Sequence, residues 1–263
     1  MELSTFEQKT EEALEDCKGA VKHCAKNALH HLRKAWKISE IDLEMSVFRG
    51  ITAEEEAASS LFYTLKNQKY KNANKLLFKE HTYKLALFPY IKSVLYDIKR
   101  LNEENGSPFS NPILQHVEHN KRKAVCLHFK VNQADLVATP TPPLHFNISY
   151  PETGKIMTFE YGFKQACQGD KFESVLKYVK HVAGERNRIL YATESGRPSI
   201  SGDIPAYLKE QKQKVFTILN IMLMIDPWIN EGKSAFVQQG LDSFLFLLEK
   251  IQEYEFEPPV DKP

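Results

Sequence analysis

The chain carries almost no net charge and lacks the short motifs of the common enzyme classes. Its 35 Lys and Arg against 34 Asp and Glu leave +1, so the molecule as a whole has no strong attraction to nucleic acid or to an anionic membrane. G-x-S-x-G, H-E-x-x-H and G-x-G-x-x-G do not occur. Their absence argues against α/β-hydrolases, zinc proteases and dinucleotide-binding enzymes, but it does not exclude every enzyme.

Cysteine and long apolar runs are also scarce. The four cysteines form no C-x-x-C pair, and scattered thiols behind an acidic, non-secretory N-terminus favour a reducing cytoplasm. The longest apolar stretch, VFTILNIMLMI at 215–225, is far shorter than the roughly 20 residues that a membrane-spanning helix needs. We therefore expect a cytoplasmic protein with no membrane partner.

The spacing of cysteine and histidine does not indicate a metal site. Cys17, Cys24 and His31 recur every seven residues, which places them on one helical face. Seven residues advance a helix by about 10 Å, whereas two ligands of one zinc ion lie within roughly 4 Å of each other. We interpret the three residues as a packing seam, and we expect no metal and no cofactor.

Helical periodicity dominates the rest of the sequence. Apolar residues at steps of three and four predict helices at 6–35, 39–65, 73–78, 81–101, 172–189, 204–225 and 233–253. Gly50 is a possible bend in the second helix. Pro89 should kink the fourth helix or begin a new first turn.

The period changes to two in the middle of the chain. Val125, Leu127, Phe129 and Val131 alternate with more polar residues, which predicts a half-buried strand. Strands at 146–150 and 156–161, joined by a PETG turn, are predicted to form a hairpin. The predicted fold is therefore mainly α: a bundle of about seven helices with a small antiparallel β-element.

This pattern also predicts how the chain is organised. We expect 1–118 to form the N-terminal half of the bundle and 119–165 to be a small antiparallel β insertion. Residues 166–255 should be C-terminal helices that complete the same bundle, followed by a disordered tail at 256–263. Exposed strand edges in the insertion can pair with another chain, so we expect self-association or a protein partner.

An acidic pair interrupts the apolar face of the second predicted helix. Within FRGITAEEEAASSLF at 48–62, Glu54 and Glu55 share the stripe of Ile51. A buried carboxylate must find a partner or take a raised pKa. If the next helix packs antiparallel, His81 meets this stripe, and a Glu–His pair is a candidate general acid/base couple. Alternatively, the glutamates bond neighbouring side chains or reach water.

The same region resembles a known family. FRGITAEEEAASSLFYTLKNQKY and the later KEHTYKLALFPYI resemble a bacterial helical family of unknown function. More distantly they are similar to HEPN/AbiV-type helical bundles, which carry a pair of glutamates on an early helix. The resemblance covers about 35–100 and implies a helical bundle, often dimeric, in RNA metabolism or antiviral defence.

Active HEPN members use an arginine followed shortly by a histidine on a helix. The comparable spacing here is Arg122 to His128, which lies on or beside the predicted strand at 125–131. The resemblance therefore carries over no catalytic residue except Glu54 and Glu55.

Two groups of basic residues are further candidates. Lys71, Lys75 and Lys79 fall on one helical line, which can follow a phosphate backbone or simply be a solvated face that balances the acidic N-terminal region. Arg186, Arg188 and Arg197 flank a loop that can hold an anion, although a surface loop is the default interpretation.

Two function classes remain open from the sequence. The first is a non-catalytic interaction or regulatory protein, associated with bacterial defence or RNA metabolism. The second is a hydrolase or ribonuclease that uses a Glu–His pair on facing helices. RNA binding by the lysine-rich helix is a third interpretation, and nucleic acid is a possible partner alongside protein.

Overall fold

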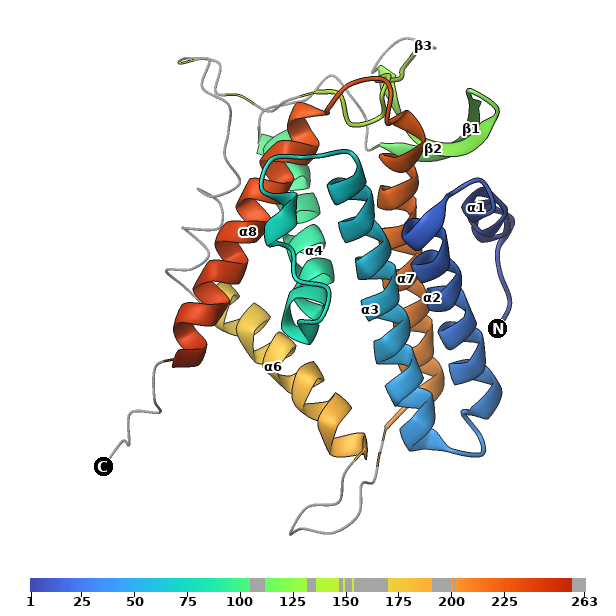
Figure 1. Cartoon of the computed structure of the whole chain (residues 1–263), viewed down its shortest axis with the longest axis vertical. Helices are drawn as coiled ribbons and strands as arrows, with labels where there is room; N and C mark the ends of the chain where they lie inside the picture. Colours follow the sequence, from blue (N-terminus) through green and yellow to red (C-terminus); the bar gives the residue numbers. More distant parts are fainter. Residues whose placement is uncertain are drawn as a thin grey trace.

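The protein is a helical bundle with a small sheet at one end (Figure 1), in a computed structural model that describes residues 1–104, 112–131, 136–146, 149, 153, 170–190, 200 and 202–256. The α-helices are α1 (Thr5–Leu14), α2 (Gly19–Ile38), α3 (Leu43–Asn67), α4 (His81–Glu104), α6 (Asp170–Leu190), α7 (Ile204–Leu223) and α8 (Ala235–Phe256). Two short 3₁₀ helices are η1 (Ala73–Lys75) and η2 (Asp226–Trp228). The predicted fold class is confirmed.

The first predicted helix is in fact two helices. α1 begins at a capping box in which Ser4 and Glu7 exchange side-chain and backbone hydrogen bonds. It ends before a short break, and α2 begins at Gly19, whose φ of +54° suits glycine. Sequence periodicity missed the break because the seven-residue apolar spacing continues through it, with Cys17 buried in the connection.

Polar contacts join α1 to distant parts of the chain. The Thr10 hydroxyl donates to Asn220 Oδ1 on α7 at 2.9 Å, and it lies 3.2 Å from His116 Nε2 on the first strand. These contacts hold α1 against both the bundle and the sheet.

α3 is the central helix, which explains why so much of it is buried. Asp42 caps it by accepting a hydrogen bond from the Met45 amide at 2.9 Å. α3 packs against α2, α4, α6 and α7. At Gly50 a Cβ atom would lie 2.9 Å from the Tyr207 hydroxyl of α7, so glycine permits a close approach of the two helices rather than a bend.

The connection from α3 to α4 corrects two predictions. The expected helix at 73–78 is only the 3₁₀ helix η1. Residues 68–80 run back along the bundle, so α4 begins beside the middle of α3 and runs parallel to it, not antiparallel (Figure 1). α4 continues through Pro89.

Three antiparallel strands form the sheet in the order β1 (Ile113–His119), β2 (Arg122–Val131), β3 (Leu136–Ala138). β1 and β2 form a hairpin whose two turn residues, Asn120 and Lys121, both have positive φ, as tight hairpins require. The predicted strand at 125–131 is confirmed, but residues 124–127 are buried on both faces, not on one. The predicted strand at 156–161 lies outside the described residues, and so does the strand at 146–150 except for 146 and 149. The predicted tail at 256–263 is described only at Phe256, which is the last residue of α8.

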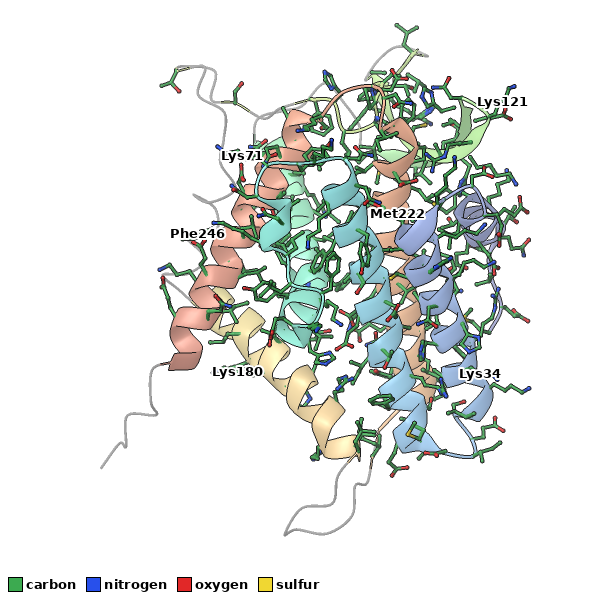
Figure 2. All side chains as sticks on the ribbon, viewed as in Figure 1. Lys34, Lys71, Lys121, Lys180, Met222 and Phe246 are labelled. Carbon is green, nitrogen blue, oxygen red and sulfur yellow. The ribbon has the colours of Figure 1, made fainter. Side chains whose placement is uncertain are left out.

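Side chains from the α-helices and from β2 meet in the bundle interior. In Figure 2, Met222 of α7 lies among the packed side chains, whereas Lys34 and Lys121 project from the periphery. Within the described residues, no helix combines the length and the apolar character needed to cross a membrane.

Candidate functional site

The predicted acidic pair lies inside a cluster of charged side chains. Both glutamates are buried, as their helical stripe predicts. Glu55 Oε1 accepts a hydrogen bond from Nδ1 of His81, the first residue of α4, at 2.7 Å. Lys84 is also on α4, and its Nζ lies 3.8 Å from Glu55 Oε2. Arg186 of α6 approaches the other side, with its Nε 3.6 Å from Glu55 Oε1. Glu55 therefore connects three helices.

Glu54 faces a different helix. Its Oε2 lies 3.8 Å from Lys214 Nζ on α7. With its amide nitrogen turned toward the carboxylate, Gln211 donates to the same oxygen at 3.0 Å and accepts from Lys214 at 3.3 Å. Lys214 also donates to the Tyr178 hydroxyl of α6 at 2.6 Å. Glu54 Oε1 has no hydrogen-bond partner among the described residues.

Burial and charge change the titration of this group. Burial raises the pKa of Glu54 to about 7, and the attraction of Lys214 only partly opposes the change. Burial by itself lowers the pKa of Lys214, but the charges of Glu54 and Tyr178 outweigh it and raise that pKa to about 12. Lys214 therefore stays a cation at neutral pH, and Glu54 is the member of the pair that takes up a proton.

His81 is the most exposed side chain in contact with Glu55. The Glu55 side chain is 4% exposed, whereas that of His81 is 42% exposed. Because Glu55 accepts from Nδ1, it orients the ring and selects the tautomer in which Nε2 is an acceptor. His81 Nε2 can therefore exchange a proton with a molecule in solvent, whereas Glu54 is fully buried and cannot.

The lysines predicted to bind nucleic acid do not form the expected line. Lys71, Lys75 and Lys79 are all exposed, but η1 is too short to place them on one helical face. Lys75 Nζ lies 3.6 Å from a carboxylate oxygen of Glu249 on α8. The three lysines therefore lie along the connection between α3 and α4, and their binding of nucleic acid stays a prediction.

The three predicted arginines separate in the structure. Arg186 faces Glu55 from α6 and is half-buried, so it belongs to the charge cluster and not to an anion-binding loop. Arg188 is exposed on the same helix. Arg197 lies outside the described residues.

Sequence reasoning did not assign three members of the cluster. Lys84 falls on the same stripe as His81, and Lys214 directly precedes the apolar run VFTILNIMLMI. A lysine on the apolar face of a helix is the signal that would have found both, because such a cation needs a buried counter-charge. Tyr178 carries no comparable signal in the sequence.

A large cavity lies toward the sheet end of the bundle, and its lining begins about one helical turn from the charge cluster, at Leu87 and Thr217. It measures about 730 Å³ and lies between α3, α4, α7, α8 and the sheet. Aromatic and aliphatic side chains form its wall, among them Phe62, Tyr90, Phe129, Met224 and Phe244. None of the described residues that line it is charged.

The energetics of such a cavity favour an occupant. Its wall is hydrocarbon, and covering apolar surface stabilises a complex by about 25 cal/mol per Å². Water does not fill apolar space favourably, because it finds too few polar partners there. The cavity is therefore a second candidate site, of a kind that binds rather than reacts.

Comparison with protein-family models, curated proteins and solved structures finds no match to this chain. The Arg–His spacing considered for HEPN-type chemistry lies on β2. There Arg122 forms an ion pair with Asp226, and His128 Nε2 lies 3.1 Å from Cys126 Sγ. These two residues therefore do not take the helical arrangement of the active members.

Proposed function

We propose that this chain is a non-catalytic interaction or regulatory protein. The observation that carries the proposal is the enclosure of its acidic pair. Glu54 and Glu55 are buried and neutralised by Lys84, Arg186 and Lys214, whereas the large cavity of the molecule contains no charged lining residue among those described. Space for a ligand and reactive groups are thus found in separate parts of the bundle.

The charge cluster has a structural role in this proposal. Its members come from α3, α4, α6 and α7, and a buried ion pair tolerates few alternative positions of its partners. Replacing one partner leaves a buried charge uncompensated, at a cost of about 3–5 kcal/mol. The cluster thereby fixes the register of these four helices.

The test compares Glu55→Gln and His81→Ala with wild type. We expect both substitutions to lower the melting temperature, because each removes a partner from the cluster, and we expect no hydrolysis of single-stranded RNA or of p-nitrophenyl esters by any of the three proteins. Glu56→Gln is the matched control, since Glu56 lies next to the pair but on a partly exposed face.

A second candidate function is acid–base catalysis at the exposed edge of the cluster. The 2.7 Å contact between His81 and Glu55, with His81 open to solvent, favours it. In RNA cleavage, His81 Nε2 would accept the proton of the 2′-hydroxyl while its oxygen attacks phosphorus to form a 2′,3′-cyclic phosphate. The bond from phosphorus to the 5′-oxygen breaks, and the 5′-oxygen takes a proton from water. RNA hydrolysis by wild type, lost in His81→Ala at an unchanged melting temperature, would replace the first proposal with this one.

The association with bacterial defence or RNA metabolism is a proposal that rests on the sequence resemblance alone. RNA binding by Lys71, Lys75 and Lys79 is likewise proposed from their exposure and charge. Affinity for RNA that falls steeply with salt concentration would support it.

A further inference from the structure

We propose that the apolar cavity binds the hydrocarbon chain of an amphiphile, namely the acyl chain of a fatty acid or of a phospholipid. This inference deepens the proposed binding function and rests on it. The cavity volume of about 730 Å³ falls within the range of about 300–1,000 Å³ that small-molecule sites have.

The lining offers a ligand almost nothing but hydrocarbon. Tyr90, Thr217 and Asn220 are the polar side chains among the described lining residues. The Tyr90 hydroxyl donates to the Gly240 carbonyl at 2.7 Å, and the Asn220 oxygen accepts from Thr10 at 2.9 Å. Because the protein itself occupies the Tyr90 hydroxyl and the Asn220 oxygen, an occupant of the cavity gains little from polar atoms of its own.

This chemistry selects against a peptide occupant. Each residue of an extended peptide brings a backbone donor and acceptor, and burying them without partners is costly. A helix satisfies its own backbone, but at a width of about 10 Å and a rise of 1.5 Å per residue the cavity would hold roughly six residues. A hydrocarbon chain has no such requirement.

The shape of the cavity fits an amphiphile with its head group in water. Leu95 of α4 and Leu114 of β1 both line the cavity and are exposed. The apolar wall therefore reaches the molecular surface between α4 and the sheet. A bound chain extends inward from this opening toward Phe62 and Phe244, and its polar end stays outside.

The test uses the full-length chain, purified without detergent. We expect native mass spectrometry to show the polypeptide with a lipid adduct, and the delipidated protein to bind cis-parinaric acid saturably at one site. Ile221→Trp fills the cavity from α7 and should weaken this binding at least tenfold. Gln213→Trp places the same side chain on the exposed face of the same helix and should bind as wild type does.

Ala138→Trp fills the cavity from β3 and repeats the test on another element, so the conclusion does not depend on the folding of one variant. Displacement of cis-parinaric acid by palmitate alone assigns a free fatty acid as the source of the chain. Displacement also by phosphatidylcholine vesicles assigns a membrane lipid.

The inference is overturned if wild type carries no adduct and binds no probe, or if folded Ile221→Trp and Ala138→Trp both bind like wild type. Either result leaves the non-catalytic function standing, because that proposal is decided by Glu55→Gln and His81→Ala. Concentration-dependent dimer formation that excludes the probe would assign the cavity to a second copy of the chain and would also overturn the inference.

Discussion

At the scale of single residues, the most informative group is Glu54. It lies in the centre of α3, where it is fully buried and faces Lys214 of α7. Its ordinary pKa of 4.5 rises to about 7 through burial. The folded state therefore binds a proton that the unfolded chain releases, and this has a consequence for stability.

We expect Glu54 to make the protein less stable as pH rises from 4.5 to about 7. A raised folded pKa contributes stability that is complete below the unfolded value and is lost as pH passes the folded value. The contribution amounts to roughly 3 kcal/mol over this window. Urea unfolding at several pH values measures it as the difference between wild type and Glu54→Gln. Glu56→Gln should retain the wild-type slope, and an equal slope in Glu54→Gln would contradict the assignment.

The candidate site was partly readable from the sequence at this scale. The stripe shared by Ile51, Glu54 and Glu55 is a local property of one helix, so helical geometry alone predicted their burial and directed attention to His81. Lys214 is 160 positions from Glu54 along the chain, and only tertiary packing brings them together. No local pattern encodes that contact, which explains why the partner of Glu54 was not predicted.

At the scale of elements, the interface of α3 with α7 depends on a glycine, Gly50, which has no side chain. Gly50 lets the Tyr207 ring lie against the α3 backbone, where the Tyr207 hydroxyl donates to the Val47 carbonyl at 3.2 Å. Helix propensity alone would favour alanine at such a position. The close approach of α3 and α7 therefore explains why position 50 is glycine and not alanine.

Gly50→Ala should destabilise the protein by about 1–3 kcal/mol, because the added methyl group overpacks the interface with Tyr207. Gly240→Ala is the matched helical control. Its Cβ would meet only the Tyr90 hydroxyl at 3.6 Å, an ordinary contact, so a change between zero and a gain of about 1 kcal/mol is expected. Equal effects of the two substitutions in urea unfolding would contradict this account of the interface.

Prediction of the elements followed their periodicity. The long helices 81–101, 204–225 and 233–253 were found because apolar stripes repeat over many turns, and β2 was found because it alternates. The 3₁₀ helix η1 was mistaken for an α-helix because three or four residues fit either geometry. β1 was missed because its side chains are mostly exposed, which leaves no apolar alternation to detect.

At the scale of the whole molecule, the sheet end of the bundle presents apolar strand residues to solvent. Among the strands that the structure describes, β3 lies at the edge of the sheet, and its Leu136 and Val137 are 64% and 53% exposed. Exposed apolar edge strands tend to pair with other chains. This is the surface at which the expected self-association or protein partner is most readily accommodated.

We expect the protein to self-associate through this edge and the double substitution Leu136→Lys with Val137→Lys to shift it toward monomer, because charged side chains oppose strand pairing. Light scattering after size-exclusion chromatography over a range of concentrations measures the shift. Ile41→Lys is the control, since Ile41 is 85% exposed in the connection at the opposite end of the bundle (Figure 1). A monomeric wild type, or an equal shift in the control, would contradict the prediction.

The hydrogen bond between Thr10 and Asn220 spans 210 positions in the chain, and this separation sets an order of events during biosynthesis. At about 5–20 residues per second, a ribosome needs roughly 10 to 40 s to travel from one partner to the other. For that time the nascent N-terminal helix has no final docking place. Newly made α2 and α3 must remain soluble with their carboxylates still hydrated, and the desolvation of Glu54 is postponed until the last third of the polypeptide arrives.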